Sequence, residues 1–279
     1  MKLAGMILVL VPFLVYGQEK NHTSVGSLET LFHHVSMFSQ VEGIDNTIPD
    51  ITTFIRRIEQ KENPRNSVKF CRVLFHKTRH EFFRHYTQYA SFKETLNHGN
   101  YNCLTGTALY AVLLQHFGIQ FSIIETNYHI FLVASTDEGK VLFEATDPVH
   151  GFVTDPVEIE KRIDTYKKNN LQPVDASDKK YYEYAANLFN AVDLKQVRGL
   201  LHFNVSIDAY NQKKFDLAIA HLDKALDLYH SSRIREFSSV LLLAVIESQL
   251  DNGLKEKYLR QIHALRKRQN LVMASRMNP

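Results

Sequence analysis

The sequence predicts an α+β protein in which helices precede and follow a short group of antiparallel strands. From about residue 24 to residue 89 the apolar residues recur at helical spacing, and a further helix begins at Cys103. Between residues 120 and 146 the period and the residue types are instead those of strands. Asp155-Pro156 then suits the N-cap and first position of a helix, and helical spacing returns up to the end of the chain.

Length and composition favour an ordinary globular protein. The 279 residues suit one large or two moderate domains, and 44% hydrophobic with 23% charged residues excludes a largely disordered or fibrous protein. The net charge of +3, without a basic block interleaved with aromatic residues, gives no indication of nucleic-acid binding. Two cysteines cannot form a disulfide framework, so the stability has to come from the core.

The N-terminus has the features of a signal peptide. Lys2 supplies a positive charge, an apolar run extends over residues 3–16, and Val15-Tyr16-Gly17 suits cleavage before Gln18. The run is shorter than the roughly 20 apolar residues that span a bilayer, and no later stretch is long enough. We therefore expect a secreted or periplasmic protein without stable membrane insertion once the signal is removed.

Three helices are expected between residues 24 and 89. The first helix is expected to turn inward Leu28, Leu31, Phe32 and Val35, and the second Ile51, Phe54, Ile55 and Ile58. The third is expected to begin at about Ser67 and to turn inward Cys71, Leu74, Phe75, Phe82 and Tyr86. His76 and His80 lie four apart on the last helix, a spacing that can ligate zinc. Lys69, Arg72 and Arg79 share that face and would repel a cation, which favours a solvated basic face and no metal site.

The middle of the chain combines one helix with a hairpin. The helix that begins at Cys103 is expected to end at Gly118. Strands are expected over residues 120–124, 128–134 and 141–146, with a turn at 137–140. The segment 169–180 is polar and contains Pro173, which indicates a linker between two domains.

Cys103 is the candidate nucleophile. It follows Asn100 and Asn102, both good N-cap residues, so its sulfur is expected in the first turn of a helix. The free N–H groups and the helix dipole favour the reactive thiolate at that place. Gly106 and the small residues around it would let other backbone approach closely. The alternative is a small buried side chain, the commoner fate of a lone cysteine.

His129 and Asp147 are the candidate partners of the thiol. They lie equally far from Glu138 in the predicted turn, so a hairpin centred there sets them opposite each other. Asp147 would then fix the tautomer of His129, while the other ring nitrogen takes the thiol proton. The alternatives are a satisfied core histidine and a turn residue before Pro148.

These residues carry a resemblance to a known family. Asn102-Cys103-Leu-Thr-Gly-Thr-Ala, then His129-Ile-Phe-Leu-Val, then Glu144-Ala-Thr-Asp147-Pro resembles the core of the transglutaminase-like superfamily, which has the papain-like cysteine-protease fold. The resemblance covers about a third of the chain. It implies a helix with the nucleophile Cys103 packed on an antiparallel sheet, His129 as general base and acid, and Asp147 as the orienting residue. Candidates for the oxyanion-hole side chain are Tyr101, Asn102 and Gln88, beside the backbone N–H of Cys103.

The C-terminal part resembles one tetratricopeptide repeat, with a degenerate neighbour over residues 240–265. The resemblance rests on Ser206, Ala209, Phe215, Ala218, Leu222, Ala225 and Leu226. Small residues let paired helices pack closely, and stacked pairs often bind peptides. The alternative is an ordinary helical cap on the first domain.

Together these features predict a signal peptide (1–17), a transglutaminase-like domain (18–168), a linker (169–180) and a helical tetratricopeptide-like domain (181–279). The expected function is thiol-dependent acyl transfer on an amide or peptide substrate, as a protease, amidase or transglutaminase, without a cofactor. The alternative is an inactive protein that keeps the fold and binds a protein partner through its C-terminal helices.

Overall fold

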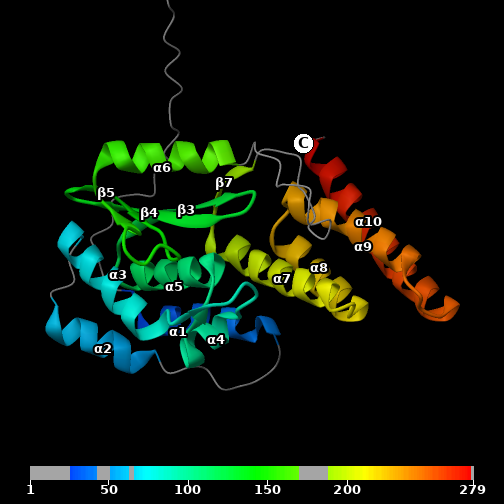
Figure 1. Ribbon diagram of the computed structural model, residues 1–279, viewed down its shortest axis with the longest axis horizontal. Coiled ribbons are helices and arrows are strands. Elements are labelled where there is room, and N and C mark those ends of the chain that lie inside the picture. Colours follow the sequence, from blue (N-terminus) through cyan, green and yellow to red (C-terminus); the bar gives the residue numbers. More distant parts are fainter. Residues whose placement is uncertain (1–25, 43–50, 63–65, 170–187, 278–279) are drawn as a thin grey trace, which may run out of the picture.

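The structure is a computed structural model that describes residues 26–42, 51–62, 66–169 and 188–277. This part of the chain is α+β, as predicted, and is built around a five-stranded antiparallel sheet of order β6-β5-β4-β3-β7 (Figure 1). The predicted signal peptide and nearly all of the predicted linker lie outside the described residues. No helix in the described ranges is both long and apolar enough to cross a membrane.

The N-terminal helices pack beneath the sheet (Figure 1). They are α1 (Leu28–Ser39), α2 (Thr52–Lys61), α3 (Val68–Phe82) and α4 (Phe92–His98), with a 3-10 turn η1 (Gln40–Glu42) after α1. Ser27, Ser67 and Ser91 accept hydrogen bonds from the first turns of α1, α3 and α4. The expected inward face of α3 is buried except at Tyr86. The helix ends at Phe82, and Tyr86 lies in β1 (His85–Tyr86) with 62% of its surface exposed.

The helix predicted at Cys103 is α5 (Cys103–His116), which packs against one face of the sheet. The predicted hairpin is present as β3 (Gln120–Thr126), β4 (Ile130–Thr136) and β5 (Gly139–Phe143), followed by the short β6 (Phe152–Val153). On the other face lies α6 (Pro156–Asn169), whose first turn is capped by Asp155 as expected (Figure 1).

Successive side chains along β4 and β5 point to opposite faces of the sheet, where they pack in two separate apolar layers. Leu132 and Phe143 belong to the large core shared with α5. Phe131 and Leu142 belong to a smaller cluster with Ile159 of α6. The residues at the end of these strands can therefore meet side chains from α5 or from α6.

The C-terminal segment adds one strand before it turns helical. β7 (Phe189–Val192) pairs antiparallel with β3, and the helices α7 (Leu194–Asn211), α8 (Phe215–Leu228), α9 (Ser232–Glu247) and α10 (Asn252–Met277) follow. The sequence predicted only helices after Asp155, and this expectation is wrong at β7; β6, which lies before Asp155, was not predicted either. Both strands are short, and β7 pairs with a strand far away in the sequence, so local periodicity gives no sign of it.

Helices α7 and α8 form a tightly packed antiparallel pair. Ala218 is fully buried there, and its carbonyl accepts a hydrogen bond of 2.7 Å from the Ser206 hydroxyl. The Ala218→Leu substitution should overpack this contact and lower the free energy of unfolding by about 1–3 kcal/mol. Ala220→Leu, the same change at an exposed position of α8, is the matched control. Equal urea midpoints for the two variants would contradict the close packing.

Candidate active site

Cys103 occupies the first position of α5 and is partly exposed. The predicted cap is present, because the Asn102 side-chain oxygen accepts a hydrogen bond of 2.9 Å from the Thr105 N–H. Cys71 and Cys103 are both free thiols. Cys71 is buried in α3, and burial, assisted by the charge of Glu138, raises the pKa of its thiol to about 12. The two cysteines thus differ sharply in access.

Asn102 also holds the preceding segment against the start of α5. Its amide nitrogen donates to the carbonyls of Gln88 at 3.0 Å and Ala90 at 3.3 Å. Both amide hydrogens are therefore engaged, which argues against the expected role of Asn102 as an oxyanion donor. Tyr101 is buried and stacks on Phe83 at 4.7 Å between ring centroids. Gln88 is exposed beside the start of α5, so its side chain and the Cys103 N–H remain the candidate donors.

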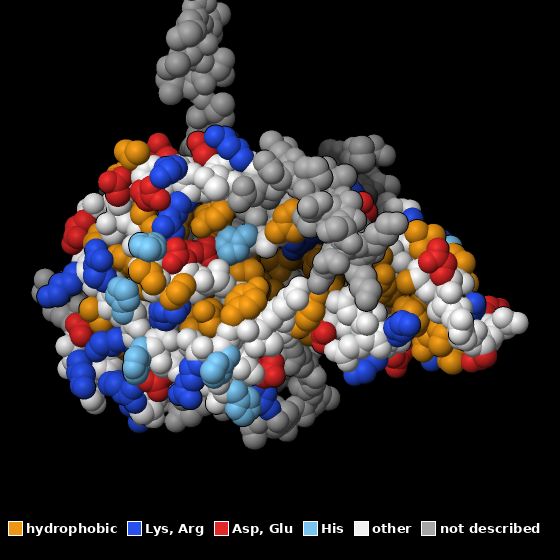
Figure 2. Space-filling model, in the orientation of Figure 1, with side chains coloured by type: hydrophobic (Ala, Val, Ile, Leu, Met, Phe, Trp, Pro, Cys, Tyr) orange, Lys and Arg blue, Asp and Glu red, His pale blue; other side chains and the backbone are white. Residues whose placement is uncertain are grey.

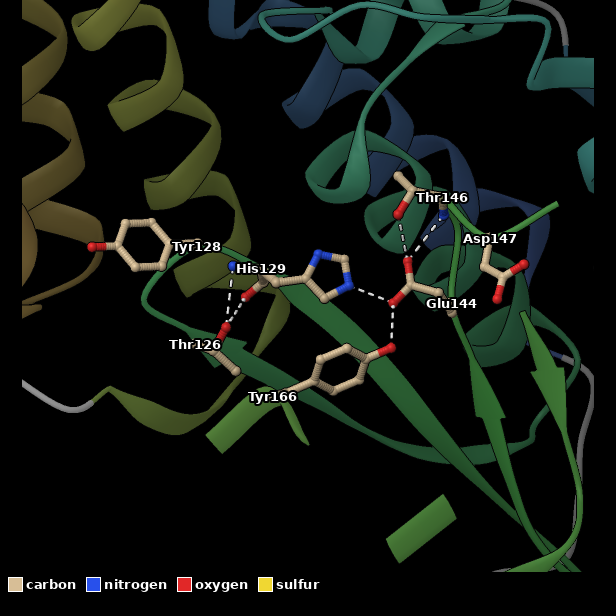
Figure 3. Close-up of a pocket in the computed structure, with 7 residues that line it drawn as sticks. All are labelled: Thr126, Tyr128, His129, Glu144, Thr146, Asp147 and Tyr166. Atoms are coloured by element: carbon tan, nitrogen blue, oxygen red, sulfur yellow. Dashed lines mark hydrogen bonds and ion pairs between the residues drawn. The ribbon is translucent and has the colours of Figure 1, made fainter. Parts of the chain in front are cut away.

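His129 directly follows the two-residue turn between β3 and β4. The turn is closed by the Thr126 N–H, which donates to the His129 carbonyl at 2.8 Å, and by the Thr126 hydroxyl, which bonds to the backbone of His129 (Figure 3). The imidazole donates from Nε2 to Glu144 Oε2. The Cys103 thiol lies close enough to the ring to act on its pKa. Because Nε2 is engaged by Glu144, Nδ1 is the ring nitrogen left to meet the sulfur.

The charge state of His129 follows from these partners. Burial alone lowers its pKa, but the interactions with Cys103 and Glu144 outweigh burial and raise the pKa to about 10. At neutral pH the ring is therefore an imidazolium between two acidic groups. An imidazolium beside a cysteine at a helix N-terminus stabilises the thiolate form.

Glu144 is the buried carboxylate that orients the histidine. Its second oxygen, Oε1, accepts from the Thr146 N–H at 3.0 Å and from the Thr146 hydroxyl at 2.7 Å. The Tyr166 hydroxyl of α6 donates to Oε2 at 3.2 Å, the oxygen that also binds His129 (Figure 3). Burial raises the pKa of Glu144, but the hydrogen bonds and the charge of His129 outweigh it and leave the pKa below its ordinary value. Glu144 is thus ionised and fully hydrogen-bonded.

The predicted hydrogen bond between Asp147 and His129 is wrong. The Asp147 carboxylate points away from the imidazole and accepts from the N–H groups of Val149 and His150, at 3.1 and 2.7 Å, and from Arg162 at 3.3 Å (Figure 3). Asp147 therefore stabilises its own loop and attaches that loop to α6.

The cause is a hairpin register shifted by one residue from the predicted one. The observed ladder pairs Leu132 with Phe143 and Thr136 with Gly139, so its centre lies between Asp137 and Glu138. A shift of one residue exchanges the faces to which side chains point. Glu144 follows Phe143 directly, at the end of β5 and on the same face of the hairpin as His129, and it takes the place expected for Asp147.

A cavity of about 330 Å³ opens beside this group. It is lined by Thr126, Tyr128, His129, Glu144, Thr146, Asp147 and Tyr166. In the face of the molecule below α6, histidine and acidic side chains lie exposed among hydrophobic ones (Figure 2). The cavity thus gives a ligand access to the face of His129 next to Glu144.

Gly106 explains how α5 comes close enough to the end of β5. A Cβ added to Gly106 would lie 2.6 Å from the Cβ of Ala145, a distance that real side chains do not adopt. The absence of a side chain at this position lets the first turn of α5, with Cys103, pack against the residue after Glu144. This agrees with the close approach expected from the sequence.

Two functional candidates, Glu144 and Tyr166, were missed by sequence reasoning. An acidic residue directly after the apolar run Val141–Phe143 was the available signal for Glu144, because a carboxylate at a buried strand end needs a partner. Tyr166 lies on a charged amphipathic helix and gave no such signal. No cluster of three or more metal-ligating side chains is present among the described residues.

Comparisons of the chain with protein-family models, with curated proteins and with solved structures gave no match. The chemistry of the site therefore has to be argued from its own geometry.

Proposed function

We propose that this protein is a thiol-dependent acyl-transfer enzyme that acts on an amide or peptide substrate. The observation that carries the proposal is the chain of contacts from the Cys103 thiol through the His129 imidazole to the buried Glu144 carboxylate. A nucleophile, a base and an orienting acid in hydrogen-bond contact are the arrangement that covalent catalysis by cysteine requires. The resemblance of the sequence to the transglutaminase-like superfamily points to the same reaction.

The proposed reaction has two stages. The Cys103 thiolate attacks the carbonyl carbon of the amide, the His129 imidazolium gives its proton to the leaving nitrogen, and the C–N bond breaks to leave a thioester. Water or an amine then attacks the thioester, gives a proton to the neutral imidazole and releases the thiolate. Water makes the protein a protease or amidase, and an amine makes it a cross-linking enzyme.

The backbone N–H groups at the start of α5 are the proposed stabilisers of the oxyanion. The Thr105 N–H is already bound by the Asn102 side chain, whereas the Cys103 N–H is one of the first-turn donors that have no acceptor within the helix. Gln88 is the side chain placed to assist it. A donor aimed at the developing oxyanion commonly contributes about 2.7–4 kcal/mol to transition-state stabilisation.

The first test is selective alkylation. Iodoacetamide at pH 6 should modify Cys103 roughly tenfold or more faster than Cys71, because a thiolate reacts and a buried thiol does not. Peptide mass spectrometry of the quenched protein gives both rates in one sample. His129→Gln should remove most of the difference, whereas His150→Gln, a change at an exposed histidine nearby, should leave it intact. Equally slow labelling of the two cysteines would contradict the proposal.

The second candidate is a binding module without catalytic activity. The specific observation in its favour is the outer face of α9, where Leu243 is 57% and Ile246 is 50% exposed. These two residues lie one turn apart on the same side of the helix, and neighbouring exposed apolar side chains favour contact with another protein. Under this proposal α7 and α8 are a tetratricopeptide-like hairpin, supported by the buried small residues Gly199 and Ala225 between them.

Export of the mature protein also remains part of the proposal. It rests on the signal-peptide features of residues 1–17.

A further inference from the structure

A buried ion pair connects α9 to the sheet. Arg233 Nη2 lies 2.8 Å from Glu125 Oε1, and the side chain of Glu125 is only 1% exposed. The Tyr229 hydroxyl donates to the other oxygen of Glu125 at 2.6 Å. A buried charge is tolerated only where it is paired and hydrogen-bonded, so this contact holds the helical segment in one position on β3.

The same guanidinium also holds the turn that precedes the candidate catalytic histidine. Arg233 Nη1 donates to the Asn127 carbonyl at 2.5 Å, and the Asn127 side-chain oxygen accepts from the Leu188 N–H at 2.7 Å. Asn127 is the first of the two turn residues between Thr126 and His129. The turn is therefore fixed from the C-terminal segment on two sides, immediately before His129.

We propose that Arg233 is a positioning residue for the site: by holding Glu125 and the Asn127 carbonyl it sets the place of His129 opposite Cys103. This inference rests on the proposed function of the Cys103–His129 pair. It means that the thiol is activated only while α9 is docked on the sheet. Displacements of about 1 Å in such a pair can change a rate by two orders of magnitude, so a small shift of the turn has a measurable effect.

The test uses two substitutions in the same buried cluster of the full chain. Arg233→Lys keeps a positive charge for Glu125, but a lysine cannot reproduce the forked contact to both Glu125 and Asn127. Tyr229→Phe removes a hydrogen bond to the same carboxylate without touching the turn. The rate of Cys103 alkylation at pH 6 and the melting temperature are measured for both variants and for the parent.

We expect Arg233→Lys to slow Cys103 alkylation roughly tenfold or more, and Tyr229→Phe to change it by less than about twofold, even where both lower the melting temperature. The imidazole pKa of His129, followed by NMR, should fall from about 10 in Arg233→Lys only. A purely structural anchor would lower the melting temperature and leave the rate and the pKa unchanged.

The outcomes separate this inference from the proposed function. If Cys103 of the parent protein is alkylated slowly, the proposed function is overturned, and this inference with it. A reactive parent together with an equally reactive Arg233→Lys variant overturns only the inference, as does an equal loss in Tyr229→Phe. Should Arg233→Lys fail to fold, Arg233→Met combined with Glu125→Met removes the pair without leaving a buried charge, and it should show the same loss of rate.

Discussion

The Glu144→Ala variant should lose roughly 99% of the activity of the wild-type protein towards an amide substrate. The activity of Glu144→Gln should lie between that of the wild-type protein and that of Glu144→Ala. Glu144 is the carboxylate partner of His129 among the described residues, so alanine removes both the acceptor and the negative charge. Glutamine can still accept from the imidazole but cannot stabilise imidazolium by charge. Turnover of a peptide amide, or Cys103 alkylation at pH 6, measures the order.

Asp147→Asn is the matched control for this prediction. Asparagine keeps an oxygen for the N–H groups of Val149 and His150, so the loop stays in place, and the activity should remain within about threefold of the parent. If Asp147→Asn lost as much activity as Glu144→Gln, Asp147 would be the residue that orients His129, and the assignment of Glu144 would be contradicted.

The pH dependence follows from the same contacts. The folded-state pKa of His129, about 10, lies above the ordinary value of 6.5, so the ion pair with Glu144 stabilises the fold fully below pH 6.5 and is lost as the pH rises through 10. Without the Glu144 charge the pKa of His129 should fall. The alkaline limit of activity should therefore move to lower pH in Glu144→Gln.

Acidification to pH 5 should destabilise the protein by on the order of 2–4 kcal/mol through one buried pair of histidines, His202 of α7 and His221 of α8. Their Nδ1 atoms lie 3.1 Å apart, and the side chains are hydrogen-bonded to each other inside the helix contact. Burial, and then neighbouring positive charges, lower the pKa of His202 to about 3 and that of His221 to about 4.

The sign follows from comparison with the unfolded chain. Above pH 6.5 both histidines are neutral whether the chain is folded or not, and the stability is independent of their titration. Below pH 6.5 the unfolded chain takes up protons that the folded protein cannot, and stability is lost down to a pH of about 3–4.

Urea denaturation at pH 7.5 and pH 5 measures the effect. The double variant His202→Gln/His221→Gln should show a smaller difference between the two pH values than the parent, whatever its stability at pH 7.5. The exposed His150→Gln should keep the full difference. An unchanged pH dependence in the double variant would show that the buried pair is not its source.

The helical parts of the fold could be predicted from the sequence because their signals are local. Asn102 caps α5 through the Thr105 N–H, and both residues lie within four positions of each other. Asp155-Pro156 begins α6 for the same reason. Such contacts need no information about distant segments, so the position of Cys103 at the start of α5 could be predicted from them.

The partner of His129 could not be predicted in the same way. The choice between Glu144 and Asp147 depended on the centre of the β4–β5 turn, where a shift of one residue exchanges the faces of a strand. Tyr166 and Arg233 approach from helices far along the chain, and only the packed structure brings them to Glu144 and Asn127. The sequence alone could therefore indicate Cys103 and His129 as a candidate pair, but not the groups that contact His129 and the turn before it.

The strand β7 has a consequence for any attempt to divide the chain. It supplies the backbone partners of β3 from Ile123 to Thr126, although it follows the segment that the sequence indicated as a linker. A fragment ending before Phe189 would leave that edge of the sheet bare, and an unpaired edge recruits strands from other molecules. The segment after the predicted linker therefore completes the sheet, and a fragment must include it if β3 is to remain an inner strand.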